Sequence, residues 1–153
     1  MVAIGDSAPE FTLPRDGGGE ISLSDLKGKA VVLYFYPRAD TSGCTKQAVA
    51  FTAMRSAMEA AGAVVLGVSK DSVKKLDKFR DKHGLQVALL SDEESDVCER
   101  YGVWIEKSMY GKSYMGIERS TFLIGPDGRV RDIWRKVKVP GHDAIVLEAV
   151  QAL

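Results

Sequence analysis

The sequence feature that most constrains the fold is an unbroken apolar run from Val31 to Tyr36 that ends at Pro37. An uninterrupted series of aliphatic and aromatic residues is typical of a strand buried on both faces of a sheet, and a proline stops such a strand. A strand of this kind needs covering layers above and below it. The run therefore predicts the central strand of an α/β protein.

A helix is predicted directly after this strand. Thr41 or Ser42 can cap its start, and apolar residues then recur at helical spacing until the helix ends near Gly62. Cys44 therefore lies in the first turn, just beyond the end of the strand. Unpaired N–H groups and the positive end of the helix dipole favour an anion there, so the thiolate form of Cys44 is favoured.

The rest of the chain alternates strands and helices. We predict short strands at 11–13 and 20–23, buried strands at 63–68 and 87–90, helices at 69–82 and within 91–102, a partly ordered surface loop at 103–118, a hairpin at 120–134 and a last helix after Gly141. Crossover helices imply a parallel portion, and the hairpin adds an antiparallel edge. The expected fold is one thioredoxin-like domain over 1–153, with a mixed central β-sheet, helices on both faces and an N-terminal strand extension.

The overall charge balance argues against polyanionic partners. Lysine and arginine number 21, as do aspartate and glutamate, so nothing points to nucleic acid or to an anionic membrane surface. The N-terminus shows no basic start followed by an apolar core, and no apolar run approaches the roughly 20 residues that span a bilayer. We therefore expect a cytoplasmic protein with no nucleic-acid and no membrane partner.

Cysteine and histidine are sparse. Two cysteines are too few for a disulfide scaffold, and with His83 and His142 they lack any close ligand spacing, so no metal site is expected. Both histidines are predicted on the surface, at helix ends. The cations between 129 and 138 are interpreted as a solvated face, because strand alternation exposes such side chains.

The segment around the first cysteine resembles a known active site. Pro37, Thr41 and Cys44 stand in the spacing P-x-x-x-T-x-x-C, which is similar to the active-site motif of the peroxiredoxins. The longer stretch YFYPRADTSGCTKQA resembles the bacterioferritin comigratory protein, or peroxiredoxin Q, subfamily. Segments APEFTL, LLSDEES, YGVW, KSMYGKSYMGIERSTFLIGPDG and WRKVKVPGH extend the resemblance over nearly the whole chain.

That resemblance implies a thioredoxin-like fold and a thiol-dependent peroxidase that acts on hydrogen peroxide and small alkyl hydroperoxides without a cofactor. It implies that Cys44 is the peroxidatic cysteine and is oxidised to a sulfenic acid, that Thr41 and Arg119 position the peroxide, and that Pro37 shapes the pocket. It also implies thioredoxin as the reductant and a monomeric state.

Ionisation of the cysteine alone does not make an efficient peroxidase, so hydrogen-bond donors are needed as well. An ordinary cysteine with a pKa of about 8.5 is a few per cent thiolate at neutral pH, so complete ionisation raises the reactive fraction by roughly 30-fold at most. The remaining acceleration must come from donors aimed at the oxygens while the O–O bond breaks. The Thr41 hydroxyl, the backbone N–H of Gly43 or Cys44 and the Arg119 guanidinium are the candidates.

The step that reduces the oxidised Cys44 has two alternatives. Many members of the subfamily carry a resolving cysteine five residues after the first, where this chain has Val49. By resemblance to another branch, Cys98 is the leading candidate for an intramolecular disulfide with Cys44, and we expect that bond to require local unwinding. Alternatively, Cys98 is a core residue and an external thiol reduces Cys44.

Two other classes of protein are alternatives for the same site. A thiol-disulfide oxidoreductase would need Cys-x-x-Cys, but Thr41 occupies the first of those positions and cannot form a disulfide. A binding module without catalysis would retain its function in a Cys44→Ser variant. Both readings account for less of the motif than a peroxidase does.

Overall fold

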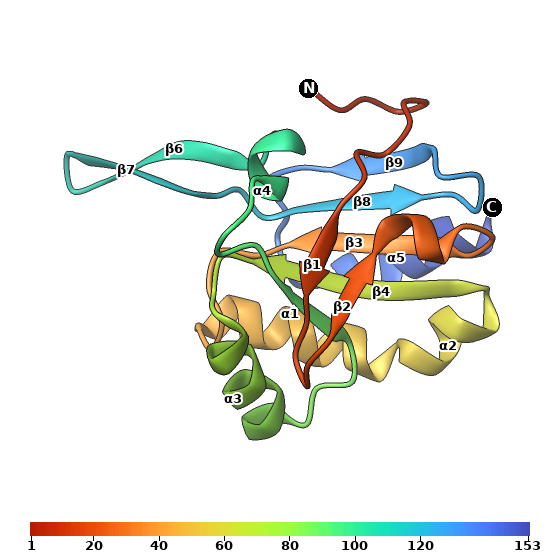
Figure 1. Cartoon of the computed structure of the whole chain (residues 1–153), viewed down its shortest axis with the longest axis horizontal. Coiled ribbons are helices and arrows are strands. Elements are labelled where there is room, and N and C mark those ends of the chain that lie inside the picture. The colour runs from red at the N-terminus through yellow and green to blue at the C-terminus, as the bar shows by residue number, and fades with distance from the viewer.

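Strand β3 (Ala30–Phe35) lies in the middle of a five-stranded sheet, and every one of its residues is buried. In the computed structural model, which describes residues 1–153, the strand order is β5-β4-β3-β8-β9 (Figure 1). β3 runs parallel to β4 (Ala63–Ser69) and antiparallel to β8 (Ser120–Ile124). The predicted central strand and the mixed sheet are confirmed.

The remaining elements surround this sheet. The helices are α1 Ser42–Ala53, α2 Arg55–Ala60, α3 Val73–His83, α4 Val97–Arg100 and α5 His142–Gln151, with a 3-10 turn η1 at Leu23–Leu26. The other strands are β1 Thr12–Pro14, β2 Glu20–Ser22, β5 Ala88–Ser91, β6 Trp104–Met109, β7 Lys112–Ile117 and β9 Val130–Trp134. No helix combines the length and the apolar character that a bilayer crossing requires.

The sheet separates two hydrophobic clusters. Side chains alternate along a strand, so Val32 and Tyr34 enter one cluster while Val31, Leu33 and Phe35 enter the other. The first cluster packs against α1, α2, α3 and α5. The second is covered by the N-terminal strands, η1 and α4, and β1 and β2 lie across that face (Figure 1). The two faces therefore have different covers, with the long helices on one side only.

The N-terminal extension is attached to the sheet through a buried carboxylate. Asp16 follows β1, and its Oδ1 accepts a hydrogen bond of 2.9 Å from the backbone N–H of Leu89 in β5. The Asp16 N–H donates in return to the Leu89 carbonyl at 2.9 Å. The predicted strand extension is thus part of the packed domain.

The helix that follows β3 is interrupted. The sequence pattern predicted one helix as far as Gly62, whereas α1 ends at Ala53 and α2 begins at Arg55. Between them Met54 has φ −89° and ψ 0°, and its N–H is shared between carbonyls three and four residues earlier. Apolar periodicity continues across such a turn, which explains why the pattern did not reveal it.

The stretch predicted as a loop is a β-hairpin. β6 and β7 pair antiparallel in full register, and the turn residues Tyr110 and Gly111 have φ 52° and 77°. Positive φ at both positions is the geometry of a two-residue type I′ turn. The loop prediction was wrong because these strands satisfy their backbone bonds with each other rather than by entering the core, so their side chains carry little apolar alternation.

A glycine in β4 makes room for a tyrosine beneath the helices. Gly67 lies opposite Tyr34 in the β3–β4 register, and a Cβ at position 67 would meet Tyr34 Cζ and Oη at 2.7 Å each. Contacts that short are repulsive. The phenol ring can therefore lie against β4 only because residue 67 has no side chain.

We expect Gly67→Ala to lower the free energy of unfolding by about 1–3 kcal/mol, the usual cost of overpacking a core. Urea denaturation followed by circular dichroism measures the change. Adding Tyr34→Phe, which removes one of the two clashing atoms, should recover part of the loss. An unchanged midpoint for Gly67→Ala would contradict this account.

Candidate active site

Cys44 is the third residue of α1 and lies at the sheet end where β3 stops. Its side chain is 1% exposed and belongs to the cluster beneath the long helices. The N–H groups of the first helical turn have no partner within an α-helix, so they and the helix dipole present partial positive charge to this sulfur. The predicted position of Cys44 at a helix start is confirmed.

Arg119 brings a second source of positive charge to the sulfur. Its Nη2 donates to Cys44 Sγ at 3.2 Å across 75 residues of sequence. The residue lies between β7 and β8, and its carbonyl accepts the N–H of Val137 at 2.9 Å, which fixes the backbone there. Gly43 leaves room for the guanidinium, because a Cβ at that position would lie 3.3 Å from Nη2.

Gln47 completes the contact and was missed by the sequence reasoning. Its Oε1 accepts a hydrogen bond of 2.6 Å from Arg119 Nη1, so the two guanidinium nitrogens bond to Gln47 and Cys44 at once. Gln47 is only 2% exposed, and its Nε2 has no partner. The available signal was a polar residue three positions after Cys44 on the apolar face of a helix.

Thr41 comes immediately before α1, and Pro37 comes two residues after the end of β3. The Thr41 hydroxyl donates to the Arg38 carbonyl at 2.9 Å, and it makes no side-chain capping bond. The predicted position of Thr41 as the N-cap residue of α1 is confirmed, but its side chain does not cap the helix, because the hydroxyl bonds to the carbonyl in the turn before it. Pro37 is half-buried directly after Tyr36.

The loop that carries Thr41 is held from two sides. The Ala39 N–H donates to Asp71 Oδ2 at 2.7 Å, just beyond the end of β4. Asp40, with φ 63°, accepts from Lys82 Nζ at 2.9 Å and bonds to His83 Nε2 at 2.8 Å. These contacts tie the start of α1 to β4 and α3, which keeps Cys44 under the guanidinium.

Two tyrosines form an apolar wall behind the sulfur. Tyr34 packs against Phe51 of α1 at 4.8 Å between ring centroids and against Tyr36 at 5.5 Å. Burial raises the pKa of both phenols, and the charge at Cys44 adds to the effect on Tyr34. Their hydroxyls have no hydrogen-bond partner. A neutral, water-poor wall strengthens the interaction between Arg119 and Cys44.

Cys98 lies on the other side of the sheet. It is part of α4, is 0% exposed and belongs to the cluster that contains Leu33 and Phe35, whereas Cys44 belongs to the opposite cluster. Both cysteines are free thiols. Burial, followed by the charge of Asp92, raises the pKa of the Cys98 thiol. The fold therefore does not bring the two cysteines together.

A buried ion pair keeps α4 in place. The Asp92 carboxylate accepts the N–H groups of Val97 and Cys98 at 3.1 and 2.8 Å. Lys70 Nζ lies 3.2 Å from Asp92 Oδ2 and 2.7 Å from Glu99 Oε1. Because Asp92 is fully buried, exposing Cys98 means breaking this network as well as the packing of α4.

His142 is not a surface residue. It is 5% exposed, its Nε2 bonds to Thr121 Oγ1 at 2.8 Å, and it packs against Phe51 and Trp134. The prediction failed because α5 begins over the long-helix cluster, which a helix-end position alone does not reveal. No group of three or more His, Cys, Asp or Glu side chains is arranged to hold a metal ion.

The cations at 129–138 are only partly solvated. Arg131 forms an exposed pair with Asp127 at 3.3 Å, as expected for a solvated face. Arg135 instead donates to the Gly102 carbonyl at 3.4 Å and lies 5.6 Å from the Phe122 ring. The interpretation of Arg135 as solvated is therefore wrong, because this residue directly follows β9 and its side chain lies against Gly102 and the Phe122 ring.

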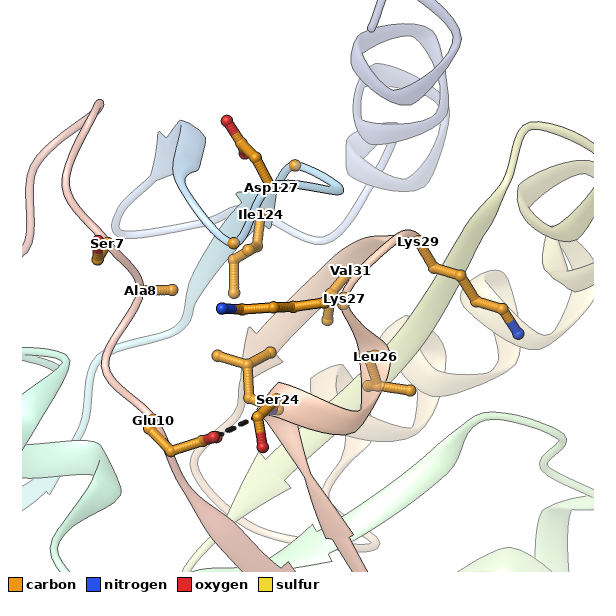
Figure 2. A pocket seen from close by; sticks show the side chains of 13 residues that line it. Ser7, Ala8, Glu10, Ser24, Leu26, Lys27, Lys29, Val31, Ile124 and Asp127 are labelled. Atoms are coloured by element: carbon orange, nitrogen blue, oxygen red, sulfur yellow. Dashed lines mark hydrogen bonds between the residues drawn. The ribbon is translucent and has the colours of Figure 1, made fainter.

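A separate pocket opens at the other end of β3. This cavity of about 170 Å³ is lined by Val31 at the start of the strand, by the N-terminal segment and by the β8–β9 turn. Figure 2 shows Lys27 extending across it and Glu10 bonded to the Ser24 backbone. No cysteine or histidine lines it, and Glu10 already accepts two backbone N–H groups, so the thiol chemistry lies elsewhere.

Comparison with known proteins agrees with the thiol site. Residues 4–133 match the model of the AhpC/TSA family. A putative peroxiredoxin Bcp from Coxiella burnetii is 53% identical over 146 residues, which are 95% of this chain and 97% of that protein. The chain belongs to the AhpC/TSA family. Within it, this chain is a peroxiredoxin of the Bcp or peroxiredoxin Q group, and hence a thiol-dependent peroxidase.

Solved peroxiredoxin structures share the whole fold. A cysteine-to-serine variant of peroxiredoxin Q from Xylella fastidiosa superposes with a TM-score of 0.94 at 42% identity, covering 99% of this chain and 97% of that one. The bacterioferritin comigratory protein of Xanthomonas campestris, studied for its alkyl peroxide reduction, gives 0.91 at 42% identity with the same coverage. The predicted thioredoxin-like peroxiredoxin fold is confirmed.

Buried His142 makes the stability of this peroxiredoxin sensitive to acid. Burial is the main reason why the pKa of His142 lies below its ordinary value of 6.5, and the Arg119 charge acts in the same direction while Asp143 opposes it. The unfolded chain therefore binds the proton more readily, so this contribution to stability is present above pH 6.5 and is lost as the pH falls below it. We expect the free energy of unfolding to fall between pH 7 and 5, and to fall less steeply in His142→Gln. Urea midpoints across that range measure it, and identical slopes for both proteins would contradict the assignment.

Proposed function

We propose that Cys44 is the peroxidatic cysteine of this enzyme. Its thiolate sulfur attacks the terminal oxygen of a hydroperoxide, the O–O bond breaks, and the leaving oxygen takes a proton to become water or an alcohol. The sulfur loses two electrons and becomes a sulfenic acid. The observation that carries this proposal is the 3.2 Å contact between Arg119 Nη2 and Cys44 Sγ at the start of α1.

Arg119 and Gln47 are proposed to act as one unit. The guanidinium holds the thiolate before reaction and faces the oxygen that gains negative charge as the O–O bond breaks. Gln47 fixes the guanidinium plane through the 2.6 Å bond to Nη1. Its unpaired Nε2, buried beside this pair, is a further donor available to a peroxide oxygen.

Thr41 and Pro37 are proposed to shape the entrance. In the present orientation the Thr41 hydroxyl donates to the Arg38 carbonyl, and its oxygen can accept a hydrogen bond from the peroxide. Rotated away from that carbonyl, the hydroxyl would donate a hydrogen bond to the peroxide instead. Pro37 has no N–H that would hold water at the pocket edge. Hydrogen peroxide and small alkyl hydroperoxides are the proposed substrates, because one similar protein of known structure was studied for its alkyl peroxide reduction.

For the recycling step the geometry favours an external thiol. Cys98 lies across the sheet from Cys44, and its thiol is held protonated by burial. An incoming thiolate attacks the sulfur of the sulfenic acid, hydroxide leaves as water, and a mixed disulfide forms. A second thiol then releases Cys44. We propose thioredoxin as the natural dithiol and a cytoplasmic monomer as the working form.

Resolution by Cys98 is the second candidate. The observation in its favour is that α4 has only four residues and depends on one carboxylate, Asp92, for its first N–H bonds. Unwinding α4 together with the first turn of α1 would be needed to join the two sulfurs, since a disulfide requires Cα atoms within about 7 Å.

Mass spectrometry after one equivalent of hydrogen peroxide distinguishes these routes. We expect a sulfenic acid on Cys44, trapped by dimedone, and no peptide that links Cys44 to Cys98. Cys44→Ser should consume no peroxide, while the matched variant Cys98→Ser should react at the rate of the wild-type protein. A disulfide-linked peptide that contains Cys44 and Cys98 would show that Cys98 is the resolving cysteine. Dimedone labelling of Cys98 alone would refute the peroxidatic role of Cys44.

Variants of the Arg119–Gln47 pair test the positioning role. Arg119→Met should lower kcat/KM for peroxide by roughly 100-fold or more, as loss of a transition-state donor does. Gln47→Leu keeps the volume but removes the acceptor, and we expect about a 10-fold loss, equivalent to ~1.4 kcal/mol. Lys46→Met, an exposed neighbour on α1, is the control. Stopped-flow peroxide consumption measures all three, and an unaltered rate in Gln47→Leu would remove Gln47 from the site.

A further inference from the structure

The β6–β7 hairpin projects from the body of the molecule (Figure 1). Its two strands pair only with each other, so both outer edges are open. Four of the nine large hydrophobic residues exposed in this protein gather on its outer half, namely Met109, Tyr110, Tyr114 and Met115, with Tyr110 98% exposed. Exposed apolar groups on open strands favour aggregation unless they serve as an interaction surface.

The register divides the hairpin into two faces. Opposed residues share a face, and successive residues alternate. One face, here called the lysine face, carries Ile105, Lys107, Met109, Lys112, Tyr114 and Gly116. The opposite face carries Trp104, Glu106, Ser108, Ser113, Met115 and Ile117.

The lysine face is cationic. It contains Lys107 and Lys112 and no acidic residue, and neither ammonium takes part in an ion pair. Glu106, the one carboxylate of the hairpin strands, lies on the opposite face. An unneutralised pair of lysines beside a tyrosine and a methionine suits a partner that is acidic around an apolar centre.

The same face leads to the thiol site. The Lys107 and Tyr114 side chains lie together over Gly116, where a Cβ would meet Lys107 Cδ at 3.2 Å and Tyr114 Cε2 at 3.5 Å. Gly116 is three residues before Arg119. Burial and then the charge of Arg119 lower the pKa of Lys107, whereas the charge of Cys44 raises it. Lys107 is therefore within electrostatic reach of both.

The opposite face turns toward the other cluster. Ile117 is buried there, Trp104 packs against it, and Lys70 Nζ lies 5.2 Å from the Trp104 ring. At the base of the hairpin, the side chains of the opposite face therefore pack with the cluster that contains Cys98. Of the two faces, the lysine face carries the side chain, Lys107, on which the charges of Arg119 and Cys44 act.

We propose that the lysine face of the β6–β7 hairpin is the docking surface for the protein dithiol that reduces Cys44. This inference rests on the proposed peroxidase function. Because Cys44 is nearly buried, a protein thiol reaches its sulfur only by contact with the surrounding surface. The hairpin projects from the body of the molecule (Figure 1), and β7 ends two residues before Arg119, which bonds to that sulfur. The partner should carry carboxylates and apolar side chains around its reactive thiol.

The test compares a protein reductant with a small one. Steady-state peroxidase rates are measured with thioredoxin and, separately, with dithiothreitol, which needs no docking surface. For Lys112→Glu/Tyr114→Ser we expect the KM for thioredoxin to rise about 10-fold, since aromatic and cationic anchors dominate such interfaces, while dithiothreitol supports the wild-type rate. Added salt should raise the KM of the wild-type enzyme more than that of the variant.

The hairpin itself provides the matched control. Glu106→Gln/Met115→Ser changes one charged and one apolar residue on the opposite face and should leave the KM for thioredoxin unaltered. Equal effects from both faces, or no effect from Lys112→Glu/Tyr114→Ser, would overturn the proposal. Absence of peroxide turnover by the wild-type enzyme with either reductant would instead contradict the peroxidase function on which it rests.

Discussion

The contact between the Arg119 guanidinium and Cys44 Sγ is the interaction around which the rest of the structure is arranged. It joins the first turn of α1 to the β7–β8 junction, two segments 75 residues apart. Each participant depends on neighbours: Gly43 leaves space, Gln47 orients the guanidinium and Asp71 holds the loop before the helix. The short distance between these two side chains therefore depends on three parts of the chain: the start of α1, the β7–β8 junction and the segment just after β4.

The sheet also lies between the two hydrophobic clusters and keeps them apart. Because β3 is buried on both faces, its side chains alternate between a cluster that contains Cys44 and one that contains Cys98. The first cluster contains the helix-start cysteine that contacts the Arg119 guanidinium, and the second lies beside the Asp92–Lys70 ion pair next to a short helix. The two thiols of this chain consequently have different surroundings: Cys44 lies against a guanidinium at a helix start, and Cys98 lies in the packed core beside Asp92.

The two faces of the β6–β7 hairpin also have different neighbours. Its base is anchored on the second cluster through Trp104 and Ile117, while its lysine face passes over Gly116 toward Arg119. A projecting hairpin has little burial to stabilise it, and its large exposed side chains add nothing to the core. Such a surface fits a role in contact with another molecule better than a role in stability.

Local sequence was sufficient for the central strand, the helix start and the position of Cys44, because a buried apolar run and a proline stop act over a few residues. The motif around Thr41 and Cys44 also pointed to Arg119, although only through resemblance. Gln47 escaped notice because its role comes from a partner 72 residues away. The burial of His142 and the pairing of the 104–117 hairpin likewise depend on elements that meet only in the folded chain.

The position of Cys98 shows most clearly that local sequence does not predict contacts between distant segments. Apolar spacing was consistent with a core residue, and the resemblance suggested a resolving thiol, yet neither could say which face of the sheet α4 would cover. That choice depends on the path of the chain over the sheet edge and on the Asp92–Lys70 pair that holds α4 there. Sequence determined by itself that this protein has a helix-start cysteine after a buried strand. Tertiary structure decided which groups surround each cysteine, because contacts between distant segments are set by packing rather than by local preference.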